Sequence, residues 1–228
     1  MIKSVLDFAW WPSLVRRRQF LDSLTDGPTI VRHVCTRGGR RRVFANQHPD
    51  EIGPLFDLVR AKQPNVIVEI GTSCGGTFYL WSRAVQSGGI VVSIDKPGEP
   101  GSVRPAMRSV YRTFGRRFGV TAITIDGDSH APETFEKVRQ VLAGRQIDFL
   151  FIDGDHSYNG VKADFESYQK LVAATGLIAM HDVSFVPGHP SIEVPKFWSE
   201  LANEKSERTE FVATRGTTPG IGVICKAA

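Results

Sequence analysis

Two apolar runs in this sequence end abruptly in carboxylates and imidazoles. Residues 149–152 are followed by Asp153, and His156 comes three positions later. A second apolar run ends directly in His181 and Asp182. If both runs are neighbouring strands of a parallel sheet, these side chains meet at its carboxyl edge, where open α/β sheets build their active sites. Oxygen and nitrogen ligands gathered there are typical of hydrolysis, metal storage or activation of a hydroxyl group.

A glycine-rich turn precedes these residues, between an earlier apolar run and a predicted helix. Gly71 suits a sharp turn, and Gly75 suits the close approach of a ligand or of the helix itself. Ser73 stands where the dinucleotide fingerprint has its second glycine, which argues against NAD. Asp95 follows the next apolar run, where a carboxylate either accepts both ribose hydroxyls of an adenosine moiety or caps a helix.

A third apolar run ends in Gly127, Asp128 and Ser129. In a nucleoside site this position contacts the adenine, and either Asp128 or Ser129 can hydrogen-bond its exocyclic amine. The same side chains are also suited to cap the helix predicted to begin at Pro132, and the two roles are compatible.

A regular alternation of elements is predicted from residue 50 onward. Its apolar runs indicate buried strands, and the segments between them have helical spacing. The predicted strands are 66–70, 90–94, 120–125, 147–152 and 177–180, and the helices are 50–62, 77–85, 104–118, 132–142, 160–172 and 194–204. This alternation implies right-handed crossovers and a parallel sheet with helices on both faces. Two final runs, 210–213 and 221–225, are joined by a short loop, so the last strand is expected to run antiparallel.

The first 48 residues differ in character from the rest. Residues 1–24 indicate one or two amphipathic helices, interrupted at Trp10-Trp11-Pro12. Residues 25–48 are basic and rich in turn formers, which predicts a short hairpin or a lid. The tryptophans either pack on the protein body or a second subunit, or anchor the segment at a membrane surface. We therefore divide the chain into an N-terminal extension, 1–48, and a main domain, 49–228.

The composition is that of an ordinary globular protein, with 228 residues, 41% hydrophobic and 23% charged. The formal net charge of +4 is mildly basic, and we interpret the excess cations as a solvated surface. The three cysteines form no Cys-x-x-Cys pair, which excludes zinc-ribbon and thioredoxin-like sites. With no signal peptide or membrane span recognisable, a cytoplasmic protein is expected.

Taken together, the motifs resemble those of class I S-adenosylmethionine-dependent methyltransferases. More narrowly, residues 151–158 and 176–183 look like the small-molecule O-methyltransferases related to catechol O-methyltransferase, and to the branch with cephalosporin-hydroxylase-like and macrolide-sugar methyltransferases. The resemblance covers about residues 50–182. It implies a Rossmann-like, doubly wound, seven-stranded sheet with an antiparallel last strand, and S-adenosylmethionine as cofactor.

The resemblance also implies roles for particular residues. The cofactor site would consist of Glu69, Gly71, Thr72, Ser73, Gly75, Asp95, Gly127, Asp128, Ser129 and Asp153. A divalent ion, magnesium or manganese, would bind Asp153, His181 and Asp182. His181 stands where the family generally has Asp or Glu, and imidazole suits manganese, iron, cobalt or zinc better than magnesium.

His156 takes the offset at which the catechol-type enzymes carry a basic lysine. It is our candidate general base, acting on an acceptor hydroxyl that the metal at Asp153 makes more acidic. The alternative is that His156 merely caps the helix that begins near Asn159. Three aromatic residues, Tyr158, Phe185 and Trp198, either line the acceptor pocket or belong to the core.

We accordingly expect methylation of a small-molecule hydroxyl by a homo-oligomer, without nucleic acid as a partner. The alternatives are a metal-dependent phosphohydrolase, an NAD-dependent oxidoreductase, and a methyltransferase-like module that binds a nucleoside without turnover. The hydrolase is disfavoured because the first turn, from Thr72 to Gly76, offers no ligand for a second metal. A base-directed nucleic-acid methyltransferase is disfavoured because the Asn/Asp-Pro-Pro-Tyr/Phe motif is missing.

Overall fold

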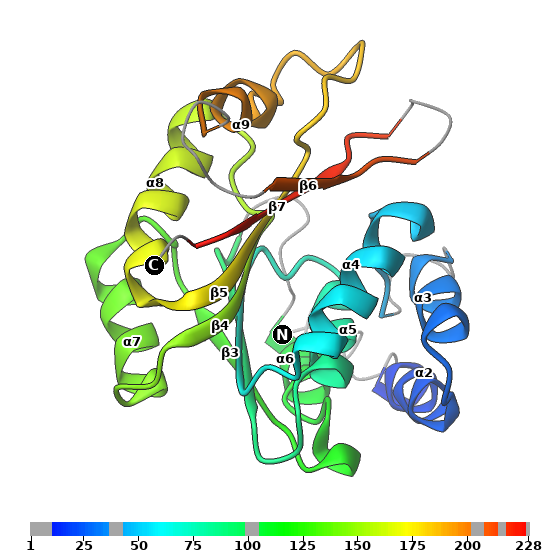
Figure 1. Ribbon diagram of the computed structural model, residues 1–228. Coiled ribbons are helices and arrows are strands. Elements are labelled where there is room, and N and C mark those ends of the chain that lie inside the picture. Colours follow the sequence, from blue (N-terminus) through cyan, green and yellow to red (C-terminus); the bar gives the residue numbers. More distant parts are fainter. Residues whose placement is uncertain (1–10, 37–42, 99–104, 202–207, 214–217, 227–228) are drawn as a thin grey trace.

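A twisted sheet lies between two layers of helices in the computed structural model (Figure 1). The model describes residues 11–36, 43–98, 105–201, 208–213 and 218–226. Its strands are β1 Val66–Ile70, β2 Ile90–Asp95, β3 Thr121–Asp126, β4 Ile147–Ile152, β5 Val172–His181, β6 Arg208–Phe211 and β7 Ile221–Cys225. They form one seven-stranded sheet in the order β3-β2-β1-β4-β5-β7-β6, which confirms the predicted doubly wound α/β fold.

The strand order places β1 and β4 side by side at the centre of the sheet. Strands β1 to β5 pair in parallel, and β7 runs antiparallel to both β5 and β6. The antiparallel last strand is thus confirmed. From β1 the chain proceeds to one side of the sheet through β2 and β3, and then returns to β4 and β5 on the other side. This reversal is the topological switch point at which α/β sheets bind ligands.

Helices cover both faces of the sheet (Figure 1). One layer holds α4 Pro49–Lys62, α5 Gly76–Ala84 and α6 Pro105–Tyr111, with α2 Trp11–Ser23 and α3 Gly27–Cys35 outside it. The other layer holds α7 Pro132–Leu142, α8 Tyr158–Tyr168 and α9 Val194–Leu201. Two 3-10 turns, η1 Arg116–Phe118 and η2 Gln169–Leu171, complete the described helical elements.

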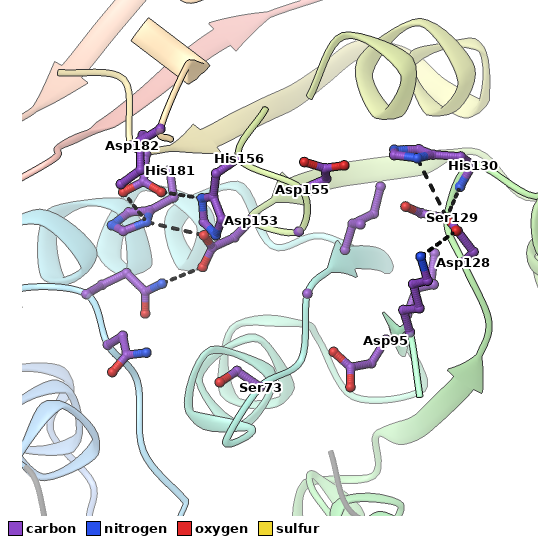
Figure 2. A pocket seen from close by; sticks show the side chains of 18 of the residues that line it. Ser73, Asp95, Asp128, Ser129, His130, Asp153, Asp155, His156, His181 and Asp182 are labelled. Atoms are coloured by element: carbon purple, nitrogen blue, oxygen red, sulfur yellow. Dashed lines mark hydrogen bonds and ion pairs between the residues drawn. The ribbon is translucent and has the colours of Figure 1, made fainter. Parts of the chain in front are cut away.

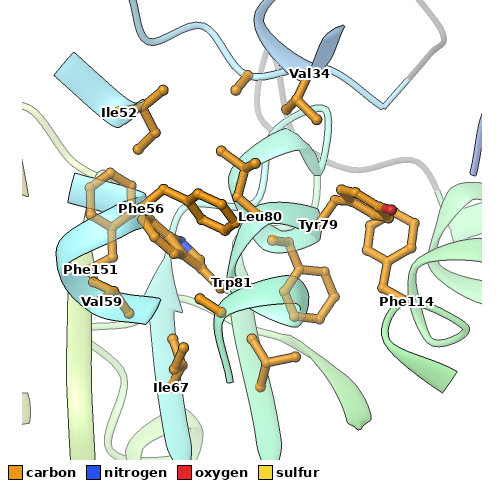
Figure 3. Close-up of a cluster of buried hydrophobic side chains, with 14 of the residues drawn as sticks. Val34, Ile52, Phe56, Val59, Ile67, Tyr79, Leu80, Trp81, Phe114 and Phe151 are labelled. Carbon is orange, nitrogen blue, oxygen red and sulfur yellow. The ribbon is translucent and has the colours of Figure 1, made fainter. Parts of the chain in front are cut away.

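Each face of the sheet has its own hydrophobic core, because successive side chains of a strand point to opposite faces. On the α5 side, the ring of Trp81 packs against Phe149 and Phe151 of β4 at centroid distances of 4.9 and 5.3 Å (Figure 3). Leu150 and Ile152 join the opposite core, with residues from α7, α8 and α9. Strand β4 is therefore held on both sides, and its end is a rigid support for Asp153.

The N-terminal extension contains a helix where the sequence predicted a hairpin or a lid; the hairpin was wrong, and the lid stays a prediction. Helix α3 begins after Asp26, whose side chain accepts a hydrogen bond from the Thr29 amide at 2.8 Å. Pro28 lies in the first turn of the helix, where proline is favoured because no intrahelical N–H bond is lost. Gly27 and Pro28, two of the turn formers in residues 25–48, are thus the start of a helix. Residues 1–10 and the basic run 37–42 lie outside the described residues.

A polar network attaches this extension to the main domain. The hydroxyl of Tyr79 in α5 donates to Asp22 of α2 at 3.0 Å. The guanidinium of Arg83 donates to the carbonyl oxygens of Leu21 and Leu24 at 3.2 and 3.0 Å.

No described helix is long and apolar enough to cross a membrane. The predicted helix 104–118 ends earlier, at Tyr111; after a turn, Gly115 at a φ of +72° precedes the separate 3-10 turn η1.

Candidate active site

The turn after β1 lies directly against the end of β4. Gly71 has a φ of +97°, and a Cβ there would lie 2.0 Å from the carbonyl oxygen of Asp153. Only glycine permits that combination. The Gly71 amide donates to Ile94 of β2, and the Asp153 amide donates to Ile70 of β1, both at 2.9 Å. The ends of three strands are thereby joined, which brings the predicted cofactor motif beside Asp153.

A cavity of about 860 Å³ opens at this edge of the sheet (Figure 2). Most of the predicted site residues line it: Gly71, Ser73, Asp95, Gly127, Asp128, Ser129, Asp153, His156, His181 and Asp182. Thr72, Gly75 and Glu69 are not among its lining residues. Gly75 faces the ring of Tyr111, since a Cβ there would lie 2.6 Å from the ring. Ile70 and Ile94 give part of the wall an apolar surface.

Glu69 lies beneath the cavity in a buried hydrogen-bond network. The Ser93 hydroxyl donates to Glu69 at 2.6 Å and lies 2.5 Å from the Thr72 hydroxyl. Burial raises the pKa of Glu69 to about 8, although the hydrogen bonds from Ser93 and Thr77 oppose the shift. The carboxyl group is therefore protonated at neutral pH, and it supports the turn from below.

Asp95 and Asp128 line the part of the cavity away from His156 and His181 (Figure 2). The Thr72 amide donates to Asp95 at 3.2 Å. Asp128 accepts from the His130 amide at 3.0 Å and pairs with Lys96 at 3.1 Å. Helix α7 has Ala131 as its N-cap, with no side-chain cap hydrogen bond, so the alternative that Asp128 or Ser129 caps this helix is wrong.

A compact cluster of four side chains forms where β4 and β5 end (Figure 2). Nδ1 of His181 lies 3.2 Å from Asp153 and 3.1 Å from Oδ1 of Asp182. Nδ1 of His156 lies 2.5 Å from the other oxygen, Oδ2, of Asp182. The helix after His156 is capped by Ser157, whose side chain accepts from the Gly160 amide at 3.1 Å. The capping alternative for His156 is therefore wrong.

Mutual pairing shifts the protonation equilibria of this cluster. Burial alone lowers the pKa of His181, but Asp153 and Asp182 outweigh it and raise that pKa to about 10. The hydrogen bond that His156 donates to Asp182 raises the pKa of His156. Burial tends to raise the pKa of Asp182, yet hydrogen bonds to both histidines hold it below its usual range. Without a bound cation, the cluster is thus a set of charge-assisted pairs.

Another histidine, His130, lies at the other end of the cavity. Nε2 of His130 is 3.3 Å from Asp164, a completely buried residue of α8. The same nitrogen lies 3.2 Å from the carbonyl oxygen of Gly160. The hydrogen bond with Asp164 raises the pKa of His130 to about 9. This pair was not predicted, because no pattern in the sequence links residue 130 to residue 164.

Several residues of the cavity come from segments that the motifs do not cover. Asn46 and Gln47 precede α4, and His189 and Ile192 lie in the loop after β5. The amide Nε2 of Gln47 donates to Asp153 at 2.6 Å. The residues after Gln47, His48-Pro49-Asp50-Glu51, indicate the start of a helix. They do not indicate that Gln47 belongs to a functional site.

The three aromatic residues considered for the acceptor pocket lie outside the cavity wall. Trp198 is buried, and its Nε1 donates to Glu210 at 2.7 Å. Tyr158 contacts Phe197 between α8 and α9, at a ring centroid distance of 6.0 Å. Phe185 is 75% exposed. Of the two options for Trp198, the core is the correct one.

Comparison with known families decides the class of this site. A family model described as "Methyltransferase domain" matches residues 68–183, just over half of the chain. The chain belongs to the methyltransferase domain family. In this methyltransferase domain the matched segment begins in β1 and ends just after Asp182, so it includes both ends of the cavity.

Solved structures share the fold of this methyltransferase domain. An O-methyltransferase from Bacillus cereus in complex with SAH is 22% identical, with a TM-score of 0.54 over 75% of this chain and 79% of that one. The O-methyltransferase TomG from Streptomyces achromogenes, in complex with SAM, is 18% identical, with a TM-score of 0.55 over 77% and 78%. A putative caffeoyl-CoA O-methyltransferase from Staphylococcus aureus is 17% identical, with a TM-score of 0.54 over 76% and 81%.

A curated relative is the uncharacterized protein y4gI of Sinorhizobium fredii. It is 26% identical over 145 residues, which are 64% of this chain. The chain spans only 16% of the length of that relative.

The cavity of the methyltransferase domain fits a nucleoside cofactor. Gly71 keeps the turn free of a side chain that would collide with Asp153. The carboxylate of Asp95, at the end of β2, is an acceptor of the kind that ribose hydroxyls require, and Ile94 beside it provides apolar surface for a base. At about 860 Å³ the cavity is of the size common for small-molecule sites.

The donor set also fits a divalent cation. Asp153, His181 and Asp182 each offer one ligand atom, and these atoms all lie within 4.8 Å of one another. Two ligands on one small cation, at bonds of about 2.1 Å, lie roughly 3 Å apart when they are adjacent. The separations of 3.1 and 3.2 Å around Nδ1 of His181 agree with that geometry.

Proposed function

We propose that this protein is an S-adenosylmethionine-dependent O-methyltransferase that acts on a hydroxyl group of a small molecule. The observation that carries the proposal is the His156–Asp182 pair beside Asp153, at one end of the cavity that Asp95 lines at the other. Support comes from family membership and from structural neighbours that are O-methyltransferases in complex with SAH or SAM.

S-adenosylmethionine would occupy the part of the cavity between Gly71 and Asp128, and when bound it supplies an electrophilic methyl group. Asp95 would accept hydrogen bonds from its ribose hydroxyls, and Asp128 or Ser129 would contact its adenine. The turn at Gly71 would direct the reactive end toward Asp153. Holding both reactants in a fixed orientation accounts for a large share of the rate enhancement in such reactions.

His156 would act as the general base. Its Nδ1 is engaged by Asp182 at 2.5 Å, which leaves Nε2 as the nitrogen that accepts a proton from the acceptor hydroxyl. Asp182 thereby orients the imidazole and stabilises its charged form, as carboxylates do in related acid–base pairs. A hydroxyl that loses its proton to His156 is the stronger nucleophile toward a methyl group.

Asp153, His181 and Asp182 would hold a divalent cation, with manganese favoured over magnesium because of the imidazole. The cation would supply charge that lowers the pKa of the acceptor hydroxyl. A metal-dependent phosphohydrolase is not favoured, since the described residues offer only this one group of three ligands. Oligomeric state and cellular location stay predictions.

Calorimetry with S-adenosylmethionine tests the proposal directly. The wild type is expected to bind it, and Asp95→Ala to weaken binding roughly 10-fold or more, because hydrogen bonds to a charged group are lost. The formation of S-adenosylhomocysteine with a panel of phenols and sugars then identifies the acceptor. Chelation is expected to suppress turnover while binding of S-adenosylmethionine persists. A wild-type protein that does not bind S-adenosylmethionine would refute the proposal.

A further inference from the structure

The segment before α4 reaches the metal-ligand cluster from outside the motifs. Its backbone is anchored on both sides: the Ala45 amide donates to Val34 of α3 at 3.1 Å, and the Gly76 amide of α5 donates to Phe44 at 3.1 Å. His48 then caps α4, and Pro49 is the first residue of that helix. The side chains at both ends of this short stretch, Gln47 and Glu51, are therefore fixed in place.

Gln47 holds the outer oxygen of Asp153. Its Nε2 donates to Oδ2 at 2.6 Å, while Oδ1 of the same carboxylate faces His181 at 3.2 Å. Gln47 is only 5% exposed, and its Oε1 has no hydrogen-bond partner among the described residues. Burying an amide oxygen without a hydrogen-bond partner costs free energy. The position of Gln47 beside Asp153 therefore indicates a function beyond packing.

Glu51 faces the outer nitrogen of His181. Its Oε2 lies 4.0 Å from Nε2 of His181, and Glu51 is completely buried. That nitrogen is buried without a hydrogen-bond partner among the described residues, whereas Nδ1 faces Asp153 and Asp182. Glu51 also accepts from the amides of Gly220, at 3.1 Å, and His48, at 3.4 Å, so its carboxylate is immobilised.

We propose that Gln47 and Glu51 are positioning residues for the cation site, Gln47 by fixing Asp153 and Glu51 by fixing His181. The inference rests on the proposed metal-assisted function. A histidine that ligates a metal through one nitrogen commonly has a carboxylate opposite its other nitrogen, which sets the ring orientation and raises the basicity of the ligand. Here that carboxylate comes from the N-terminal side of the chain, about 130 positions from the histidine that it orients.

Binding of Mn²⁺ to the full chain, measured calorimetrically without S-adenosylmethionine, tests the assignment. Gln47→Leu removes the donor to Asp153, and Glu51→Gln removes the charge opposite His181 while keeping the size of the side chain. Each is expected to lower the affinity for Mn²⁺ roughly 10- to 100-fold, with the affinity for S-adenosylmethionine largely unchanged. Wild-type affinity for Mn²⁺ in both variants would overturn the proposal.

A matched control separates positioning from loss of stability. Asp26→Ala removes the cap of α3 in the same N-terminal region, away from the cluster, and should lower the melting temperature but leave Mn²⁺ affinity intact. If this control loses Mn²⁺ affinity to the same extent, the specific roles of Gln47 and Glu51 are refuted. A partial recovery in Glu51→Asp, which restores the charge, supports the role of the carboxylate.

The wild type distinguishes this inference from the proposed function. A protein that binds S-adenosylmethionine but not Mn²⁺ overturns the positioning roles and leaves methyl transfer standing. A protein that binds Mn²⁺ with the expected dependence on Gln47 and Glu51, but not S-adenosylmethionine, supports the positioning roles and refutes methyl transfer.

Discussion

Both ends of the cavity place a histidine against a carboxylate, but the two ends differ in the number of histidines that one carboxylate pairs with. Asp182 contacts His156 at 2.5 Å through one oxygen and His181 at 3.1 Å through the other. At the other end, His130 lies 3.3 Å from the buried Asp164 and 3.6 Å from the partly exposed Asp128, and neither carboxylate pairs with a second histidine among the described residues. The difference follows from position, because two parallel strands end together beside Asp182, whereas a loop and a helix approach each other beside His130.

We therefore distinguish the cluster at β4 and β5, where several titratable groups meet and can do chemistry, from the His130–Asp164 pair, which is structural. The cluster at β4 and β5 can exchange a proton or hold a cation because its groups face one another and the cavity. The His130–Asp164 pair neutralises a buried charge and holds the loop after β3 against α8. Three experiments test this difference between the two ends of the cavity.

The largest effect is expected at Asp182. Asp182→Asn should reduce turnover roughly 10²- to 10⁴-fold, because the variant loses both the orienting partner of His156 and a charged cation ligand. The rate of S-adenosylhomocysteine formation measures it. Asp148→Asn is the matched control: Asp148 accepts from the amides of Asn65 and Val66 at the opposite edge of the sheet, and its variant should keep the wild-type rate.

A smaller effect is expected from the two histidines, and they should differ from each other. His156→Gln should lower kcat about 10²-fold by removing the base. His130→Gln should leave kcat close to wild type and change mainly the KM for S-adenosylmethionine, since His130 lines the distant end of the cavity. Equal losses of kcat in the two variants would break the comparison.

The smallest effect is a change in the pH dependence of stability. His130 has a folded-state pKa of about 9, raised from 6.5 by Asp164. Its stabilising contribution is complete below pH 6.5 and is lost as the pH rises through 9. Melting temperatures of Asp164→Asn should therefore decline less than those of the wild type between pH 6.5 and 9. Parallel declines would show that the pair contributes nothing to stability.

Much of the fold was predictable because local patterns decided it. The apolar runs of β1, β2 and β4 are buried on both faces, and such strands stand out in a sequence. Predictions failed where local signals were ambiguous: the turn formers of residues 25–48 predicted a hairpin, but Gly27 and Pro28 begin α3 instead. The segment 104–118 has helical spacing throughout, but α6 ends at Tyr111 and Gly115 precedes the separate turn η1.

Asp153, His181 and Asp182 were predicted as one cluster because their spacing after apolar runs is local information, and parallel strands bring such ends to one edge. Gln47, Glu51 and Asp164 were not found. Gln47 lines the cavity, whereas Glu51 and Asp164 are buried behind histidines that line it. All three come from a helix or loop whose own pattern describes only capping or amphipathicity.

The sequence alone predicts most element types from residue 50 onward, the antiparallel last strand, and the edge at which carboxylates and imidazoles gather, since these depend on periodicity and on strand ends. Which oxygen of Asp182 contacts which histidine, and the positions of Gln47 and Glu51 behind Asp153 and His181, follow only from tertiary packing. Gln47 and Glu51 lie more than 100 positions from their partners, and these contacts are set by how α4 and the sheet pack together.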